Sequence, residues 1–313
     1  MSIKDTLRKE KSMIANYIKE RKDDELLRHC VPLTDDEKYL NFTKQQLKQE
    51  LITNHENEWK NKTIHGKYFR EVEKRELADY AWLKQARFKK ETEALIMAAQ
   101  EGALRLNYIK HTVDHTTNSG KCRMCQQFYE TVEHVVCGCP KLARSEYIVR
   151  HNRVGALVHW GLARKWGFQT HEKYYHHVPE RVLESQACKI LWDFSIRTDK
   201  KVQSQRPDIV IVLKKEKCCF LVDFSIPWDY RVKDKMKEKI EKYEELSFEI
   251  KRIWKLVNVQ VIPVIVGGLG SMWRLDLQRQ LEILGINNII NVNTLQKEAL
   301  LGTARILRKT LNI

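Results

Sequence analysis

The chain has 313 residues, of which 42% are hydrophobic and 31% are charged, a balance typical of globular rather than disordered proteins. Its formal net charge of +15 attracts polyanions, so nucleic acid is the expected partner, although an acidic protein or an anionic membrane would feel the same field. No run of about 18 apolar residues is present, and the segment MSIKDTLRKEK lacks the apolar core of a signal peptide. We therefore expect an intracellular protein, nuclear or cytoplasmic and not secreted, with no membrane partner.

The N-terminal part of the chain is predicted to be helical. Residues 1–79 are predicted to form a basic helical arm, because their Lys- and Glu-rich sequence with scattered Leu and Ile is typical of short solvated helices. Residues 80–120 are predicted to form a helical linker, because strong helix formers with apolar residues at helical spacing extend to Tyr108. A stretch rich in Thr, Asn, Ser and Gly at residues 111–120 then indicates a loop.

A cluster of cysteines occupies the next predicted segment, residues 121–140. Cys122 and Cys125 form a CxxC pair, His134 follows after eight intervening residues, and two more cysteines come shortly after it. Thiolate sulfur and imidazole nitrogen are the donors of structural zinc, and a CxxC turn presents two thiolates from one tight loop. The spacing therefore predicts a zinc knuckle.

The fourth zinc ligand is left open by spacing alone, because both Cys137 and Cys139 stand within reach of His134. The alternative is an ordinary loop with reduced cysteines and no metal. A redox-active CxxC is disfavoured, because no strand and helix flank the pair in the thioredoxin manner.

Residues 141–180 are predicted to form a helical connector, and residues 181–313 an α/β domain of about four strands flanked by helices. Short runs rich in Val, Ile and Phe predict strands at Lys189–Ile196, Asp208–Leu213, Cys219–Ile226 and Val259–Gly268. Apolar residues at three- and four-residue spacing predict one long amphipathic helix over Tyr230–Val257. Further helices are predicted at Met272–Leu284 and Leu295–Leu311.

Two carboxylates stand on neighbouring predicted strands. Asp208 opens one strand directly after Arg206 and Pro207, and Asp223 lies 15 residues later in the next strand. This separation matches two strand halves joined by a hairpin, so both carboxylates can reach one edge of a sheet and bind a hard cation such as magnesium through oxygen. Such an ion activates water for hydrolysis of a phosphodiester. The alternative is an aspartate that only starts a strand.

The predicted long helix offers cations to the same site. Lys239 and Tyr243 are four residues apart and share a helix face, and Lys242 is adjacent. They could stabilise charge on a phosphate, although lysines on a helix commonly form a solvated face.

Several segments together carry a family resemblance that extends from about Trp82 to the end of the chain. They include ETEALIMAAQEGAL, KCRMCQQFYETVEHVVCGC, ARSEYIVRHN, VLESQACKILWDFSIRTDK, RPDIVIV, LVDFSIPWD, KEKIEKYEEL, VIPVIVGGLG and LLGTARILRK. In order and spacing they resemble the C-terminal region of reverse-transcriptase polyproteins of non-LTR retrotransposons, the site-specific class of LINE-type elements that carry a restriction-like endonuclease.

The resemblance implies a set of metal ligands. In that family a CCHC zinc knuckle precedes the nuclease, and the matching residues here are Cys122, Cys125, His134 and Cys139, with structural zinc. The nuclease resembles the PD-(D/E)xK superfamily, whose catalytic magnesium ligands map onto Asp208 and Asp223. Ser225 stands where that superfamily usually has lysine, and the family's displaced lysine corresponds to Lys239, with Lys242 and Tyr243 alongside.

The resemblance also implies nucleic-acid contacts. Arg150 and His151 match a short basic motif upstream of the nuclease, and Arg206 and Lys242 are expected to contact nucleic acid beside the acidic pair. Glu184 is a candidate for an additional acid. The implied function is a DNA endonuclease segment that nicks target DNA to prime reverse transcription, with the target DNA, element RNA and a linked reverse transcriptase domain as partners.

The sequence departs from a complete polyprotein in one respect. It contains no Tyr/Phe-x-Asp-Asp polymerase signature, because Asp35 and Asp36 follow Leu33 and Thr34 rather than an aromatic residue. The chain is therefore not expected to copy RNA by itself. The alternative function is a catalytically inactive or domesticated zinc-containing module that binds nucleic acid.

Overall fold

The computed structural model of the protein describes residues 44–63 and 65–312. The chain divides into two units, Met1–Thr63 and Ile64–Ile313. Within the first unit, helix α3 (Lys44–Lys60) carries an ion pair between Lys60 and Glu56, one helical turn apart at 2.7 Å. The expected short helices of residues 1–43 lie outside the described residues.

The second unit contains a mixed five-stranded sheet in the order β1-β2-β3-β4-β5. Its strands are β1 (Val182–Glu184), β2 (Cys188–Trp192), β3 (Ile209–Leu213), β4 (Cys218–Ser225) and β5 (Asn258–Ile265). The first four run antiparallel to their neighbours, and β5 pairs parallel to β4. A parallel pair needs a crossover, and residues 226–257 provide it. The predicted mixed α/β architecture is therefore confirmed.

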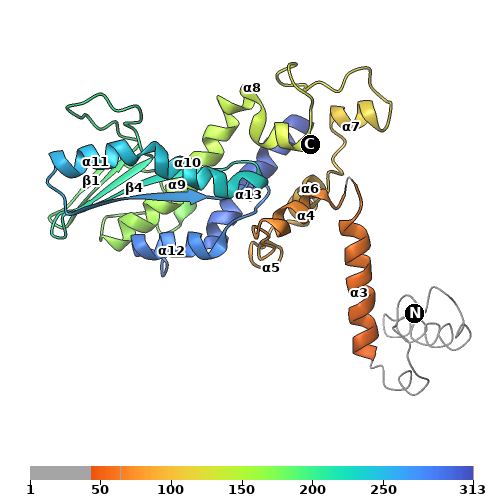
Figure 1. The fold of residues 1–313 in the computed structure, drawn as a ribbon, viewed down its shortest axis with the longest axis horizontal. Coiled ribbons are helices and arrows are strands. Elements are labelled where there is room, and N and C mark those ends of the chain that lie inside the picture. The colour runs from red at the N-terminus through yellow and green to blue at the C-terminus, as the bar shows by residue number, and fades with distance from the viewer. Residues whose placement is uncertain (1–43, 64, 313) are drawn as a thin grey trace, which may run out of the picture. The chain divides into compact units, whose positions relative to one another are not determined.

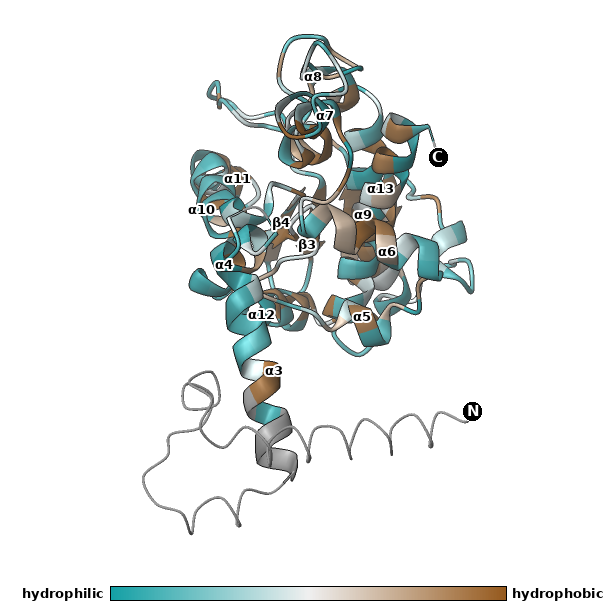
Figure 2. Cartoon of the chain, turned by 90° about the vertical axis from the view of Figure 1, so that its right-hand side faces the viewer, coloured by the Kyte–Doolittle hydropathy of each residue, from teal (hydrophilic) through white to brown (hydrophobic). Residues whose placement is uncertain are grey.

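Helices cover both faces of this sheet, which explains why its strands are apolar on both sides. Helices α10 (Val232–Lys242) and α11 (Glu244–Ile253) lie along one face, where Val210 and Leu221 pack against Leu246. Helices α9 (Glu146–Lys165) and α12 (Arg274–Leu284) cover the other face (Figure 1). Helix α13 (Val292–Leu311) packs on α9. Figure 2 shows the apolar strands β3 and β4 between these helical layers.

A second core joins the N-terminal helices and the cysteine-rich segment to the sheet unit. Its elements are α4 (Lys67–Lys74), α5 (Trp82–Gln85), α6 (Lys90–Gln100), α7 (Asn107–Thr112), the π-helical turn η2 (His134–Gly138) and α8 (Pro140–Ala143). Except for α7, which has no buried residue, each of these elements contributes buried residues to one cluster with Met236 of α10 and Leu307 of α13. Residues from the expected arm, linker, knuckle and nuclease segments thus belong to one compact unit.

Gly268 shows how closely these parts approach. A Cβ atom at this position would lie 2.6 Å from Cγ1 of Val136 and 2.9 Å from Sγ of Cys137, so only glycine allows the turn after β5 to pack against η2. The cysteine-rich segment is consequently packed against the sheet and is not a separate domain.

The predicted long helix over Tyr230–Val257 is wrong, because the chain breaks between α10 and α11 at Tyr243, whose φ is −109°. The Tyr243 side chain at the break is fully buried and hydrogen-bonds to Asp223 on β4. The short edge strand β1 was not predicted, while β2 to β5 lie within the predicted strands or shifted from them by a few residues. Within the described part of the chain, no helix combines the length and apolarity needed to cross a bilayer.

Candidate functional site

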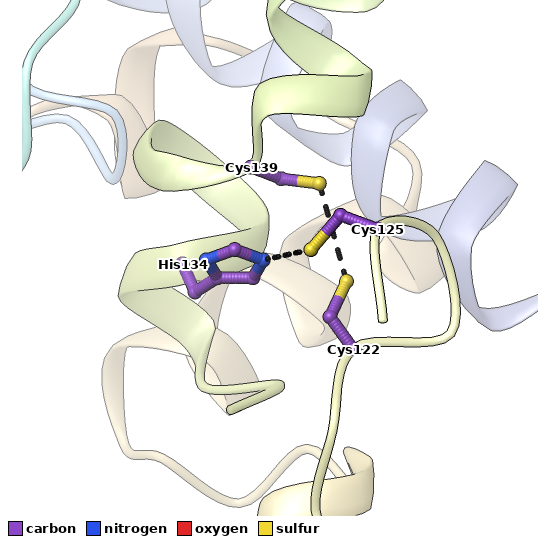
Figure 3. A group of neighbouring side chains, drawn as sticks. All are labelled: Cys122, Cys125, His134 and Cys139. Carbon is purple, nitrogen blue, oxygen red and sulfur yellow. Dashed lines mark hydrogen bonds between the residues drawn. The ribbon is translucent and has the colours of Figure 1, made fainter. Parts of the chain in front are cut away.

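Four predicted metal ligands converge in the cysteine-rich segment. The Sγ atoms of Cys122 and Cys139 are 4.0 Å apart, and Sγ of Cys125 lies 3.3 Å from Nε2 of His134. All four ligand atoms lie within 4.8 Å of one another. Figure 3 shows Cys122 and Cys125 on one loop, facing His134 and Cys139 on the helical turn opposite. We call these four residues the Cys/His cluster.

The loop of the Cys/His cluster is built by backbone hydrogen bonds. The Cys122 amide donates to the Phe128 carbonyl at 2.8 Å, and the Gln126 amide donates to the Cys122 carbonyl at 2.8 Å. Gln126 adopts a left-handed conformation with φ of +58°, which closes the turn. A single bridge between Lys121 and Tyr129 seals its base. The CxxC pair is thus held in a tight hairpin that turns both sulfurs inward.

Glu130 stabilises this hairpin through hydrogen bonds to its backbone and to the preceding helix. Its fully buried carboxylate accepts hydrogen bonds from the amides of Arg123 at 2.7 Å and Asn107 at 2.9 Å, and it also pairs with the Arg123 guanidinium. Burial alone would raise the pKa of Glu130, but these donors hold it below its ordinary value. The role of Glu130 is not predictable from the sequence, since a lone glutamate inside the motif carries no spacing signal.

The π-helical turn η2 selects Cys139 over Cys137 as the fourth member. Residues five apart are hydrogen-bonded neighbours in a π-helix, which brings Cys139 above His134. The Tyr147 hydroxyl fixes the turn by accepting from the Cys139 amide at 3.0 Å and donating to the Val135 carbonyl at 2.8 Å. Cys137 points away, with its Sγ 3.7 Å from the Ile226 carbonyl.

The donor set and spacing of the Cys/His cluster fit a tetrahedral metal such as zinc. Zinc–sulfur bonds of about 2.3 Å in a tetrahedron place two sulfurs ~3.8 Å apart, close to the separation of Cys122 and Cys139. Burial lowers the pKa of His134 despite the opposing influence of Glu130, which favours the neutral, metal-binding imidazole. The predicted convergence of the four ligands is confirmed.

Asp208 lies immediately before β3, at a point where three elements meet. Its Oδ2 accepts a hydrogen bond from the Phe224 amide at 2.7 Å and lies 3.1 Å from Nε2 of His151 on α9. Burial alone would raise the pKa of Asp208, but the hydrogen bond and charge of His151, the Phe224 amide and Lys239 hold it below its ordinary value. The carboxylate form is therefore favoured.

Asp223 lies on β4 with its side chain only 3% exposed, on the face covered by α10 and α11. Its Oδ1 accepts a hydrogen bond from the Tyr243 hydroxyl at 2.6 Å, and its Oδ2 contacts the ammonium of Lys239. Lys242 stands 3.6 Å from Oδ1. Burial and the nearby Asp223 carboxylate raise the pKa of Tyr243 well above its ordinary value, so the hydroxyl stays a donor.

The two carboxylates belong to one site, because the residue after Asp223 donates its amide directly to Asp208. The antiparallel pairing of Ile209 with Val222 explains this contact. Asp208 directly precedes Ile209 and Asp223 directly follows Val222, so the two aspartates lie next to each other at the same end of the β3–β4 pair. We call Asp208, Asp223, Lys239, Tyr243 and His151 the acidic site. The sequence-predicted acids, lysine and tyrosine therefore come together as expected.

His151, which matched a DNA-contact motif, turns its imidazole toward Asp208 and packs edge-on against Phe224 at 5.9 Å, with 30% of its side chain exposed. Its contact with DNA stays a prediction. Burial lowers the pKa of His151, but Asp208 outweighs this and raises it overall. Gly155, one turn further along α9, lets the helix approach the sheet, since a Cβ there would lie 2.7 Å from the Trp192 ring.

Of the other expected nucleic-acid contacts, Arg206 and Lys242 lie on the surface beside the acidic site, and Arg150 is buried. Arg206 is 58% exposed and pairs with Asp193 at 2.6 Å, and its carbonyl lies 3.0 Å from the Tyr243 hydroxyl. Lys242 is 40% exposed and donates to the Tyr243 hydroxyl at 2.7 Å. Both side chains are accessible beside the acidic site.

Glu184, the candidate additional acid, lies on β1, where it pairs with Lys189 and Lys214 toward the opposite end of the sheet. It therefore does not join Asp208 and Asp223.

Arg150 is only 2% exposed, so its burial does not support the expected DNA contact. Its guanidinium donates to the Val136 carbonyl at 2.9 Å, to the hydroxyl of Thr303 at 2.9 Å and to the Ile226 carbonyl at 3.4 Å. These acceptors belong to η2, α13 and the end of β4. Arg150 therefore links the Cys/His cluster to the sheet and the C-terminal helix.

Replacement of Arg150 by alanine is expected to lower the free energy of unfolding by about 3 kcal/mol, because buried acceptors lose a charged donor and a cavity remains. Chemical denaturation monitored by circular dichroism measures the change. Arg153, exposed on the same helix, is the matched control, and Arg153→Ala should shift stability by no more than ~0.5 kcal/mol. Equal stabilities of the two variants would contradict the structural role of Arg150.

Comparison of the chain with protein-family models and with curated proteins finds no match. The chemistry of the Cys/His cluster and of the acidic site is therefore the basis for a functional conclusion.

Proposed function

We propose that this chain is a magnesium-dependent DNA endonuclease with a structural zinc site, and that it represents the endonuclease segment of a non-LTR retrotransposon polyprotein. The observation that carries the proposal is the acidic site, in which Asp208 and Asp223 from adjacent strands meet Lys239. A mixed sheet with two acids at neighbouring strands is the arrangement expected of a PD-(D/E)xK nuclease, and a lysine on the following helix corresponds to the displaced lysine of the retrotransposon enzymes.

The donor set of the acidic site fits magnesium. This ion is commonly held by one or two carboxylates, with water and substrate phosphates completing its shell. Asp208 and Asp223 would hold it, and both belong to a partly enclosed sheet end that leaves Asp208 21% exposed. When bound, the ion would supply Lewis-acid polarisation of the phosphate and lower the pKa of a bound water.

The chain's own residues prepare the site for an anionic substrate. His151 and the Phe224 amide orient Asp208, and Tyr243 orients Asp223. Lys239 is held against Asp223 with only 17% of its side chain exposed, where a positive charge is only weakly screened by water. Arg206 and Lys242 at the rim are proposed to contact the phosphates of the flanking strand.

The Cys/His cluster is proposed to bind zinc in a structural role. Cys122 and Cys139 are fully buried, so no ligand position faces the solvent on their side. The cluster stands in the same core as α4, α10 and α13. Zinc at this point would fix η2 and, through Arg150, the start of the nuclease fold.

The nuclear or cytoplasmic location and the partnership with element RNA and a linked reverse transcriptase domain are proposed on the family resemblance alone.

A second candidate function is a zinc-containing module that binds nucleic acid without cleaving it. It is favoured by the contacts of Asp223, since Oδ1 already accepts a hydrogen bond from Tyr243 and Oδ2 already forms an ion pair with Lys239. A buried carboxylate paired with a lysine occurs in purely structural ion pairs as well as in catalytic sites. The two functions differ in their dependence on magnesium.

A plasmid-nicking assay separates the two candidates. Purified, zinc-loaded protein is expected to convert supercoiled plasmid to the open-circular form in magnesium and not in magnesium-free buffer without a chelator, which leaves the structural zinc in place. Asp208→Ala is expected to abolish nicking, whereas Asp199→Ala, which removes an exposed acid paired with Arg252, should leave it unchanged. Wild-type protein that binds duplex DNA but nicks no faster than Asp208→Ala would rule out the endonuclease and leave the binding module.

A further inference from the structure

Two adjoining cavities open on the face of the sheet that carries α11, at its β1–β2 edge. Their volumes are about 590 and 600 Å³, and they share Leu191, Phe194 and Trp254 in their walls. The first extends toward the β3–β4 turn and the second toward the loop after β2. We call the combined feature the aromatic-basic groove.

The walls of the aromatic-basic groove combine planar aromatic rings with an apolar floor. Trp254 caps the C-terminal end of α11 and is half-buried, so one part of its indole packs on the sheet while another faces the groove. Phe194 stands opposite on the loop after β2 and is 37% exposed. Leu191 and Val212 form the floor between them. Exposed aromatic faces of this kind are the surfaces on which unpaired bases stack.

The charge of the aromatic-basic groove is wholly positive among its described lining residues. Six basic side chains line it and no carboxylate does: Arg181, Lys189, Arg197, Lys214, Lys217 and Lys255. Glu184 neutralises Lys189 and Lys214 from outside the groove. The other four form no ion pair with any described residue at 4.0 Å or less, so they are available to phosphates.

The aromatic-basic groove begins beside the acidic site. The Asp193 amide donates to the Asp208 carbonyl at 2.8 Å, and Phe194 is the next residue. From there the lining continues past Trp254 to Lys217 in the β3–β4 turn. The loop after β2 thus connects the groove to the segment that carries Asp208.

We propose that the aromatic-basic groove binds single-stranded DNA, with bases stacked on Trp254 and Phe194 and phosphates on Lys217, Lys255, Arg181 and Arg197. Base faces are inaccessible inside a duplex, so aromatic walls select an unpaired strand. Recognition of RNA uses polar contacts to the 2′-hydroxyl, and Ser195 is the only hydroxyl side chain among the described lining residues. We infer that the bound strand is an end released by nicking at Asp208, and this part of the inference rests on the proposed function. The binding of single-stranded DNA by the groove does not depend on it.

The test measures binding of a fluorescein-labelled 12-nucleotide oligo(dT) by fluorescence anisotropy with the full chain, in magnesium-free buffer without a chelator, so that no magnesium-dependent cleavage occurs and the structural zinc is kept. Trp254→Ala is expected to weaken binding about tenfold or more, and Trp254→Phe to retain most of it, because either ring stacks on a base. Lys217→Glu with Lys255→Glu should weaken binding and make it less sensitive to salt, because two phosphate contacts are lost. Phe248, 68% exposed on α11 outside the groove, is the matched control, and Phe248→Ala should bind normally.

Several outcomes bear on the inference. Affinity for a 20-base-pair duplex that is unchanged in Trp254→Ala supports a groove specific for single strands. Equal oligo(dT) affinities of Trp254→Ala and wild type would overturn it, provided that both unfold at the same temperature. Tighter binding of oligo(U) than of oligo(dT), lost on Trp254→Ala, would overturn the assignment to DNA. Binding without any nicking in magnesium would support the groove while refuting the proposed endonuclease.

Discussion

A Cys139→Ser variant is expected to lose bound zinc and to fall in free energy of unfolding by more than about 4 kcal/mol, since binding of a structural metal is directly coupled to folding. Sγ of Cys139 is fully buried beside Sγ of Cys122, and the hydrophobic side chains around it belong to the same core as α10 and α13. Loss of the metal should therefore loosen both the hairpin and this core. Elemental analysis measures the zinc, and denaturation in urea measures the stability.

Cys137→Ser is the matched control for this result. Its sulfur lies outside the cluster against the Ile226 carbonyl, where a serine hydroxyl can donate instead. This variant should keep one zinc per chain and lose no more than ~1 kcal/mol of stability. Retention of zinc by Cys139→Ser together with its loss from Cys137→Ser would contradict the assignment and make Cys137 the fourth ligand.

The Cys/His cluster shows what residue spacing can and cannot predict. Cys122, Cys125 and His134 follow from the chemistry of a CxxC turn and a nearby imidazole. The fourth ligand does not, because an α-helical turn would favour neighbours three or four residues apart, whereas η2 is a π-helical turn that brings residue 139 over residue 134. That turn depends on Tyr147, whose hydroxyl reaches it from α9.

The fold shows the same division between local and long-range information. Runs of β-branched and aromatic residues predicted β2 to β5, because these strands are buried on both faces and read as apolar in isolation. The break between α10 and α11 could not be predicted, since the apolar spacing continues through it. At the break, Tyr243 hydrogen-bonds to Asp223 on β4, a contact between segments separated in the sequence that apolar spacing does not encode.

Arg150 and His151 show why a motif does not reveal the direction of its side chains. Arginine is rarely buried without partners, so an exposed DNA contact is the natural expectation for a basic pair. Here α9 turns one residue toward α13 and the other toward Asp208. The acceptors of Arg150 come from three segments far apart in sequence, and no local pattern encodes their meeting.

Lys239→Ala is expected to slow plasmid nicking by about 10²–10³-fold while leaving affinity for duplex DNA nearly unchanged, the magnitude typical of losing one charge-stabilising donor at a reacting centre. Its ammonium is the cation in contact with Oδ2 of Asp223, whereas Lys242 lies 3.6 Å from Oδ1 and is more exposed. Single-turnover nicking rates at saturating protein separate this effect from weaker binding.

Lys237 provides the control, because it lies exposed on the same helix two residues away, and Lys237→Ala should nick at the wild-type rate. Removal of Lys239 also leaves the Asp223 carboxylate with fewer donors, so melting temperatures must accompany the rates. Lys239→Arg is informative here, because it keeps the positive charge beside Asp223 but presents it as a planar fork in place of a compact ammonium. If Lys239→Ala nicked as fast as Lys237→Ala, the lysine would be a structural partner of Asp223, and the charge that a phosphodiester cleavage requires would have to come from Lys242 or Arg206.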